Sequence, residues 1–270
     1  MKFTLKKYLV FFCVVFGLLG NAAAYAEPAE RSTAYQLYLE AAETLTQADS
    51  YLMAMDMAML ISIIIDIGIG DPFVLDMESE SEIIMAIQLV GEDEFIMFME
   101  MVTVTMDEEV EITAYFADGW FYMDTLGQKI KMEMSFNEAM AQAGVNGITV
   151  FEEEHIYEYF VEETEYGTLI TFIIQSDAVY ELIGSQMDLF EEFTEDGYET
   201  EFSFSDMEYT ALIGEDGKFV YIIMQFAVEM DVDGIIMVMD SFIHIDIIQV
   251  GGIEIELPGD LDEYLEIKLF

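Results

Sequence analysis

Basic residues are scarce in this chain of 270 residues. Lysine and arginine together number 8 against 55 aspartates and glutamates, which gives a formal net charge of −47. Binding to nucleic-acid phosphates draws its affinity from lysine and arginine, so no nucleic-acid partner is expected. Electrostatic adhesion to anionic lipid is disfavoured for the same reason. If the protein has charged partners, we expect cations or basic surfaces.

Cysteine and proline are also rare. The single cysteine, Cys13, lies inside an apolar run near the N-terminus, and the residues around it do not form a lipobox. Removal of that segment leaves no cysteine, which excludes disulfides, thiolate metal sites and cysteine nucleophiles from the mature chain. Only 3 prolines occur, so no proline-rich linker marks a domain boundary. We expect one domain over residues 27–270, with a loose internal duplication as the alternative.

Residues 1–26 have the pattern of a secretory signal peptide. Lys2, Lys6 and Lys7 provide a positive start, Tyr8–Gly20 is an apolar run, and Ala24-Tyr-Ala26 is a cleavage site with small residues. The run is short for a membrane span, and an uncleaved anchor is the alternative. Cleavage leaves 5 bases against 55 acids, a formal charge of −50. We expect a secreted or extracytoplasmic protein of the cell envelope.

Apolar periodicity predicts helices at the start and in the middle of the mature chain. Spacings of three and four residues predict helices over Ser32–Ala48 and Asp177–Phe193. A capping box begins a shorter helix at about Ser135–Ala143, and Glu152–His155 is a further single turn.

Alternation with a period of two predicts strands over most of the rest. They begin at Ser50 and continue over Phe73–Val90, Glu94–Met106, Glu109–Ala117, Trp120–Asp124, Lys129–Met134, Ile156–Glu163, Thr168–Gln175, Tyr198–Ile213, Lys218–Val232 and Ile235–Val250. Short turns such as Asp118-Gly119 and Asp233-Gly234 imply antiparallel hairpins. The sequence therefore predicts an α+β domain with one large twisted antiparallel sheet of about ten strands.

Motifs for catalysis are missing. There is no Gly-x-Ser-x-Gly elbow and no glycine-rich phosphate loop before a helix. The two histidines, His155 and His244, are too few for a three-histidine zinc site, and we expect His244 to face outward from its strand. With 55 acids, any chosen pair of carboxylates arises by chance. We therefore expect no enzyme, no catalytic residues and no cofactor.

Two acidic turns are the candidates for a calcium site in this sequence. Glu215-Asp-Gly217 and Asp231-Val-Asp233 resemble fragments of calcium loops, but neither completes the twelve-residue pattern of an EF-hand. We expect solvated hairpin turns, no closed metal site, and only diffuse cation binding by the whole acidic surface.

Methionine is abundant, with 21 residues, and it recurs at alternate positions of several strands. Unbranched, polarizable thioethers line irregular apolar surfaces well. Three readings stay open: an ordinary core, a core that also borders a ligand hollow, and a soft-metal site for Cu(I). For the hollow, the candidate ligand-lining residues are Met53, Met55, Met57, Met97, Met99, Met101, Phe226 and Met237.

Several segments resemble secreted proteins of Gram-positive bacteria with the LolA/LppX-like half-barrel. They are Asp118-Gly-Trp-Phe-Tyr-Met-Asp124, Gly127-Gln-Lys-Ile-Lys131, Met134-Ser-Phe-Asn-Glu-Ala-Met140 and Leu257-Pro-Gly-Asp-Leu-Asp-Glu-Tyr264. The resemblance covers most of residues 32–266. It implies a half-barrel, a strongly curved antiparallel sheet with helices on its concave face. It also implies a lipid or lipoprotein carrier, although many relatives begin with a lipobox cysteine that this chain lacks.

Two functions follow as hypotheses. The first is a secreted non-enzymatic binding protein that holds an apolar ligand, a lipid or acyl chain, between the sheet and the helices. The alternative is a structural or interaction module at the cell surface with a filled core and an acidic, cation-binding exterior. The sequence leaves membrane contact open.

Overall fold

The computed structural model describes residues 33–65, 72–91, 94–105, 108–134, 151–180, 200–232 and 235–267. The predicted signal peptide, residues 1–26, and the predicted helix at about Ser135–Ala143 lie outside these ranges. Of the predicted helix Asp177–Phe193, only the beginning is described, and residues 176–180 are helical.

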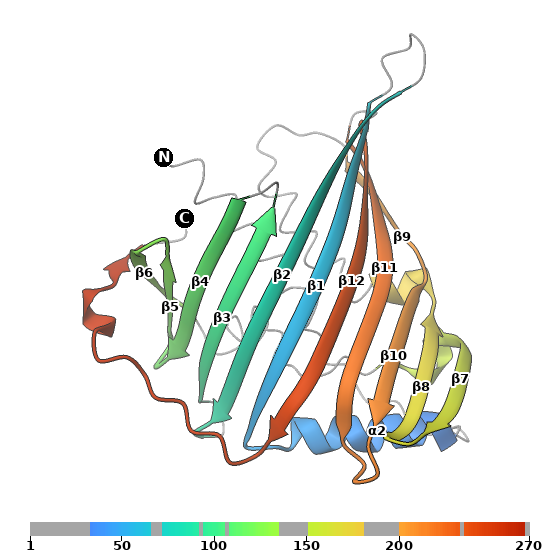
Figure 1. Cartoon of the computed structure of the whole chain (residues 1–270), viewed down its shortest axis with the longest axis horizontal. Coiled ribbons are helices and arrows are strands. Elements are labelled where there is room, and N and C mark those ends of the chain that lie inside the picture. Colours follow the sequence, from blue (N-terminus) through green and yellow to red (C-terminus); the bar gives the residue numbers. More distant parts are fainter. Residues whose placement is uncertain are drawn as a thin grey trace.

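Most of the described chain forms one large, open, curved sheet (Figure 1). Its 13 strands lie in the order β13-β6-β5-β4-β3-β2-β1-β12-β11-β10-β8-β7, with β9 paired to β11. The strand bounds are β1 Ser50–Ile65, β2 Phe73–Leu89, β3 Phe95–Thr105, β4 Glu108–Ala117, β5 Trp120–Thr125, β6 Gln128–Glu133, β7 Ile156–Thr164, β8 Gly167–Ile174, β9 Thr200–Phe204, β10 Met207–Ile213, β11 Phe219–Val232, β12 Ile235–Val250 and β13 Leu265–Glu266. Two single 3₁₀ turns, η1 Glu153–His155 and η2 Leu261–Glu263, and the α-helix α2 are the other elements described over their full length.

Tight turns join neighbouring strands as the sequence predicted. Asp118 and Gly119 both have positive φ between β4 and β5, which matches the right-handed twist of a hairpin. Gly167, between β7 and β8, has φ of 137°, and a Cβ there would lie 2.1 Å from the carbonyl oxygen of Ile213. Only glycine therefore fits at this position, where β8 approaches β10.

The helix α2, Thr33–Thr46, packs on the sheet by one face. Its Tyr38 ring makes edge contacts with Phe172, Tyr209 and Phe219, at centroid distances of 5.2, 5.6 and 5.8 Å. These rings belong to β8, β10 and β11, and Figure 1 shows α2 crossing the lower ends of these strands. The helix thus closes one end of the sheet.

Strand register places α2 on the same face as the methionines. Tyr209 is directly opposite Met224, Met224 is opposite Ile243, and Ile243 is opposite Met57. Residues directly opposite each other on paired strands share one face of a sheet. The helix α2 therefore packs on the methionine-bearing face of the sheet, at the end formed by β8, β10 and β11.

Three details differ from the sequence-based expectation. The sheet has more strands than the ten predicted, partly because the predicted strand Tyr198–Ile213 is broken into β9 and β10 at Ser205 and Asp206. There the Ser205 hydroxyl accepts a hydrogen bond from the Ala227 amide, at 2.7 Å, in place of a strand carbonyl. The expectation of purely antiparallel pairing is wrong at one place, because the short β13 pairs with β6 in parallel.

The parallel pair has a clear local cause. Tyr264 packs its ring edge-on against Tyr122 at 5.5 Å, and Lys129 lies over the Tyr264 ring and forms an ion pair with Asp260. The Ile267 amide then donates to the carbonyl of Lys131 at 2.9 Å. These contacts fix the C-terminal segment along the edge of β6.

Candidate functional site

All eight candidate ligand-lining residues lie on one face of the sheet. Met53 and Met55 of β1 are directly opposite Met85 and Ile83 of β2, which in turn face Met99 and Met101 of β3. Across β1, the register continues through β12 to Met224 and Phe226 of β11. The alternation of each strand thus produces one continuous apolar surface, here called the methionine face.

The methionine face is closed to solvent over most of its length. Met55, Met57, Met97, Met99, Met101 and Phe226 are buried, whereas Met53 and Met237 are half-buried. Met237 lies opposite Ile63, ten residues along β1 from Met53, or about 34 Å away at 3.4 Å per residue. The structure therefore gathers the six other methionines on the adjacent strands β1 and β3 either side of β2, and it places Phe226 at the row of Met59 and Met237 four residues further along the same face.

Sequence reasoning missed Met85, which has no exposed surface and lies between Met53 and Met99. The sequence could have identified Met85 as a buried residue, because Ile83, Met85 and Ile87 alternate within the predicted strand Phe73–Val90. What the sequence does not give is the register that brings this strand between the other two.

A belt of hydroxyl groups crosses the methionine face, and the sequence analysis missed it as well. Ser79 and Ser81 of β2 each share a hydrogen bond of 2.9 Å with a threonine of β3, Thr105 and Thr103 respectively. Ser241 of β12 lies on the other side of β1, opposite Met59. Because Met59 also faces Ser79, the three strands carry their hydroxyls at the same height. We call these five residues the hydroxyl belt.

Ser241 is the member of the belt with unused bonding capacity. It is 6% exposed, and its Oγ has no hydrogen-bond partner among the residues that the structure describes. Its neighbours across the strands are Met59 and Phe226, neither of which offers a strong polar partner. Buried hydroxyls are nearly always hydrogen-bonded, so the Ser241 hydroxyl is an exception on this face.

A second buried hydroxyl lies at the other end of the same face. Tyr51, opposite Ile87, is 6% exposed, and its OH also has no partner in the described part of the chain. Burial raises the pKa of Tyr51 well above its usual range, since the phenolate loses its hydration. Burial acts in the same direction on the pKa of Tyr38 in α2 and on that of Tyr209, which lies against it. The methionine face is therefore a region of low polarity that disfavours charge.

Among the described residues, charged side chains are absent from the buried part of the methionine face. Among the described residues, the buried polar side chains are serines and threonines, with no carboxylate, lysine or histidine. Acids occupy the opposite face, where Asp56 and Glu82 are directly opposite each other. His244 lies there too, opposite Asp56, with its Nε2 3.4 Å from Asp246, so its predicted outward orientation is confirmed.

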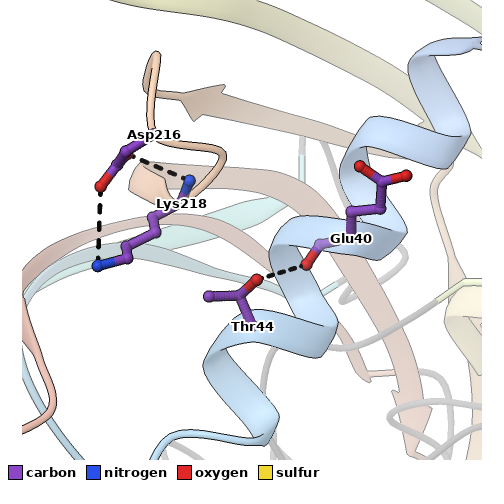
Figure 2. A network of polar contacts seen from close by, with 4 residues as sticks. All are labelled: Glu40, Thr44, Asp216 and Lys218. Atoms are coloured by element: carbon purple, nitrogen blue, oxygen red, sulfur yellow. Dashed lines mark hydrogen bonds and ion pairs between the residues drawn. The ribbon is translucent and has the colours of Figure 1, made fainter.

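Two of the described lysines, Lys129 and Lys218, form ion pairs with aspartates at the protein surface. Figure 2 shows Lys218 in the turn between β10 and β11, where its ammonium lies 3.7 Å from Asp216 and its amide donates to the same carboxylate at 3.3 Å. Both side chains are largely exposed, so the pair adds little stability. In the same view, the Thr44 hydroxyl of α2 donates to the carbonyl of Glu40 at 2.8 Å, which satisfies it within the helix.

One group of potential metal ligands lies at the surface. Glu152, Glu154 and His155 surround the turn η1, with ligand atoms within 4.8 Å of one another. Glu154 is exposed and the other two are half-buried. Open acidic clusters of this kind are common without an ion, and nothing else on the described surface points to one here.

No helix within the described ranges is both long enough and apolar enough to cross a membrane.

Comparison with known proteins gives no family. No family model matches the chain, and no curated protein matches it significantly. Among solved structures, LprF from Mycobacterium bovis is similar with a TM-score of 0.40 and 10% identity, over 87% of this chain and 99% of that one. The ywiB protein from Bacillus subtilis follows with a TM-score of 0.18 and 7% identity, over 74% of this chain and 94% of that one. An N-terminal dehydratase from the difficidin assembly line has a TM-score of 0.14 and 8% identity, over 80% of this chain and 83% of that one. These scores are too low to assign either a fold family or an activity, and the function is argued from the methionine face itself.

Proposed function

We propose that this protein is a secreted, non-enzymatic binding protein that holds a lipid or another apolar ligand on the methionine face. In this proposal the methionine face is the concave side of a half-barrel, and the ligand lies between it and the helices. The observation that carries the proposal is the unpartnered hydroxyl of Ser241, buried on an otherwise apolar surface. Ligand sites of this kind are mostly apolar, with a few polar groups that fix orientation.

The chemistry of the face defines the ligand. Met59, the neighbour of Ser241, lies eight positions along β1 from Tyr51, so the apolar surface between the hydroxyls of Tyr51 and Ser241 is about 27 Å long. A long apolar chain fits such a surface. The hydroxyl belt offers hydrogen bonds without charge, and the acidic protein disfavours anions. The polar end of the ligand is therefore expected to be neutral, such as an ester, an amide or an alcohol.

Methionine suits this role better than leucine or valine. Its unbranched thioether side chain rotates freely and adapts to different neighbours, so one surface accepts ligands of several shapes. Among the described residues, the buried part of this face carries no charged side chain, which also supports a role without acid–base chemistry.

Native mass spectrometry of gently purified protein tests the proposal directly. We expect a co-purified apolar molecule that organic extraction removes and that a neutral lipid replaces. Ser241→Val should weaken the return of that lipid, because its polar end loses a hydrogen bond. Ser203→Val is the matched control, since Ser203 is exposed on β9. Equal rebinding by both variants would contradict the assigned role of Ser241.

The alternative function is a surface module with a filled core. The complete burial of Met99 and the near-complete burial of Met97 and Met101 favour it, since packed methionines need no ligand. Under this alternative, no lipid is recovered from native protein and none binds after extraction. Under the same alternative, calorimetric titration should show that a cationic peptide binds, and the binding surface should be the acidic face that carries Asp56 and Glu82.

A further inference from the structure

The two ends of the described sheet differ in how they are covered. At one end, the C-terminal segment adds the short strand β13 to β6, and the Ile267 amide donates to the carbonyl of Lys131. At the other end, β7 is the last strand in the described order, and Figure 1 shows it at the margin of the sheet. Alternate residues of a terminal strand direct their backbone N–H and C=O groups away from the sheet. The β7 edge is therefore available to pair with a further strand.

β7 is also exposed on both of its faces. Each of the residues 157–163 is exposed, and Tyr159, Phe160 and Val161 are 48%, 56% and 50% exposed. Native edge strands are commonly protected from pairing by proline, by lysine or by a bulge. β7 contains neither proline nor lysine, and its one register shift lies before Glu158. From Glu158 onward the strand is a regular edge with exposed apolar side chains.

One face of β7 continues the methionine face. Tyr159 is directly opposite Phe172 of β8, and Phe172 is opposite Tyr209 of β10, which lies on that face. Val161 shares the orientation of Tyr159, because side chains two residues apart in a strand point to the same side. A strand added beside β7 would therefore meet apolar neighbours at these two positions.

The other face of β7 alternates between acid and aromatic side chains, in the order Glu158, Phe160, Glu162. Residues 151–180 contain no lysine or arginine, so no basic side chain of this stretch pairs with the two acids. Unlike charges and apolar pairs directly opposite each other on neighbouring strands both stabilise a sheet. The matching segment has two basic residues four positions apart, opposite Glu158 and Glu162, with apolar residues at the three positions between them.

A second copy of β7 does not meet this requirement. The antiparallel pairing that matches the apolar residues puts Phe160 opposite Phe160, and it then puts Glu158 opposite Glu162 twice. Like charges directly opposite each other destabilise a sheet. The formal net charge of −47 adds a long-range repulsion between copies. A basic segment incurs neither penalty, so charge selects it over self-association.

We propose that β7 is the docking edge for an extended, basic segment of a partner protein, which adds to the sheet as a further strand. Main-chain hydrogen bonds hold such a segment, and its side chains at alternate positions determine which segment binds. This inference goes beyond the proposed function, since it requires no ligand on the methionine face.

Fluorescence anisotropy with the full mature chain tests the proposal. The probe is a labelled peptide, Thr-Lys-Val-Tyr-Val-Lys-Thr, blocked at both ends. Wild-type protein should bind it at least about tenfold more tightly than the same peptide with glutamate in place of lysine. N-methylation of the three central amides keeps every side chain but removes the backbone donors, and it should abolish binding.

A charge exchange on the protein locates the site. Glu158→Lys with Glu162→Lys should weaken binding of the lysine peptide at least about tenfold and should strengthen binding of the glutamate peptide, a gain that an unfolded variant cannot show. The matched control is Glu78→Lys with Glu80→Lys, which makes the same change of net charge at exposed positions of β2. At physiological ionic strength this control should leave both affinities nearly unchanged. Hydrogen exchange should show that the bound lysine peptide protects amides within residues 157–163.

Four results would each overturn the proposal: no binding of the lysine peptide to wild-type protein, equal binding of its N-methylated form, equal losses in the two double variants, or protection confined to other strands. A wild-type dimer that the lysine peptide dissociates would also overturn it, because the β7 edge would then bind a second copy.

Discussion

Replacement of Glu82 by lysine should stabilise the protein in low salt. Glu82 of β2 and Asp56 of β1 are directly opposite each other on the exposed face, so two like charges meet across the central pair of strands. Opposed Cβ atoms lie about 5 Å apart, which puts the carboxylates at roughly 6 Å. Coulomb's law in water then gives a repulsion of about 0.7 kcal/mol. Glu82→Gln removes this term, and Glu82→Lys reverses it, for a gain of about 1.4 kcal/mol.

Urea unfolding is the suitable assay, because urea carries no charge and leaves the ionic strength free to vary. The control is Glu208→Lys on β10, which makes the same change of net charge opposite Ile173 and Gln225. The difference between the two variants isolates the local pair, and it should vanish in 1 M salt, where the screening length falls to about 3 Å. A Glu82 gain that equals the control in low salt, or that persists in high salt, would refute the assigned register or the strength of the repulsion.

Three other predictions address the core, the C-terminal segment and the ions. Met99→Ala, at a fully buried position, should lower the free energy of unfolding by about 2–5 kcal/mol, whereas Met77→Ala, at a half-buried position near the start of β2, should lower it by under about 1 kcal/mol. Similar losses for the two variants in urea titrations would contradict close packing around Met99. The hydrogen bond and ion pair with Lys129 hold the pKa of Asp260 below its usual value, so their contribution is present above the ordinary carboxyl pKa of about 3.9 and is lost as the pH falls through the lower folded value. The protection factor of the Ile267 amide, which is its exchange rate relative to an unstructured amide at the same pH, should therefore fall only in acid in the wild type, but already at neutral pH in Asp260→Asn. Equal protection of the two proteins at neutral pH would contradict this. Finally, the melting temperature should rise with NaCl, and Ca²⁺ at constant ionic strength should add little; a large effect of micromolar Ca²⁺ would reveal a specific site.

The strands were predictable because alternation and turn residues gave the same answer. The Asp118-Gly119 turn adopts positive φ at both residues, and the predicted strands on either side match β4 and β5 to within one residue. The break between β9 and β10 was not predictable. The alternation of apolar residues continues on both sides of Ser205, so the sequence shows no break there. The break depends on residues that are distant in the sequence, because the Tyr157 hydroxyl and the Ser176 amide both donate hydrogen bonds to the Asp206 carboxylate.

The candidate site was predictable strand by strand but not across strands. Parity places Met97, Met99 and Met101 on one face of a strand, whichever strand lies beside it. The hydroxyl belt depends on register, because Ser81 meets Thr103 only when β2 and β3 are aligned as they are. A shift by one residue would send one partner to the other face. Pairs of residues far apart in the chain leave no local signal of that alignment.

Strand length decides which part of a uniform pattern becomes core and which becomes surface. The four neighbouring strands β2, β1, β12 and β11 contain 17, 16, 16 and 14 residues, while β3 and β10 on either side of this group contain 11 and 7. The alternation of β1 continues unchanged from Met55 to Ile63, yet Met55 is 2% exposed and Ile63 is half-buried, because the outer strands have ended between the two rows. The rows beyond the ends of β3 and β10 are therefore the least buried part of β1 and β2. Deletion of residues 63–75, joined by a two-residue Asn-Gly turn, should shorten β1 and β2 and leave the melting temperature nearly unchanged, since the lost rows are the least buried. A large drop in melting temperature would show that these rows stabilise the fold.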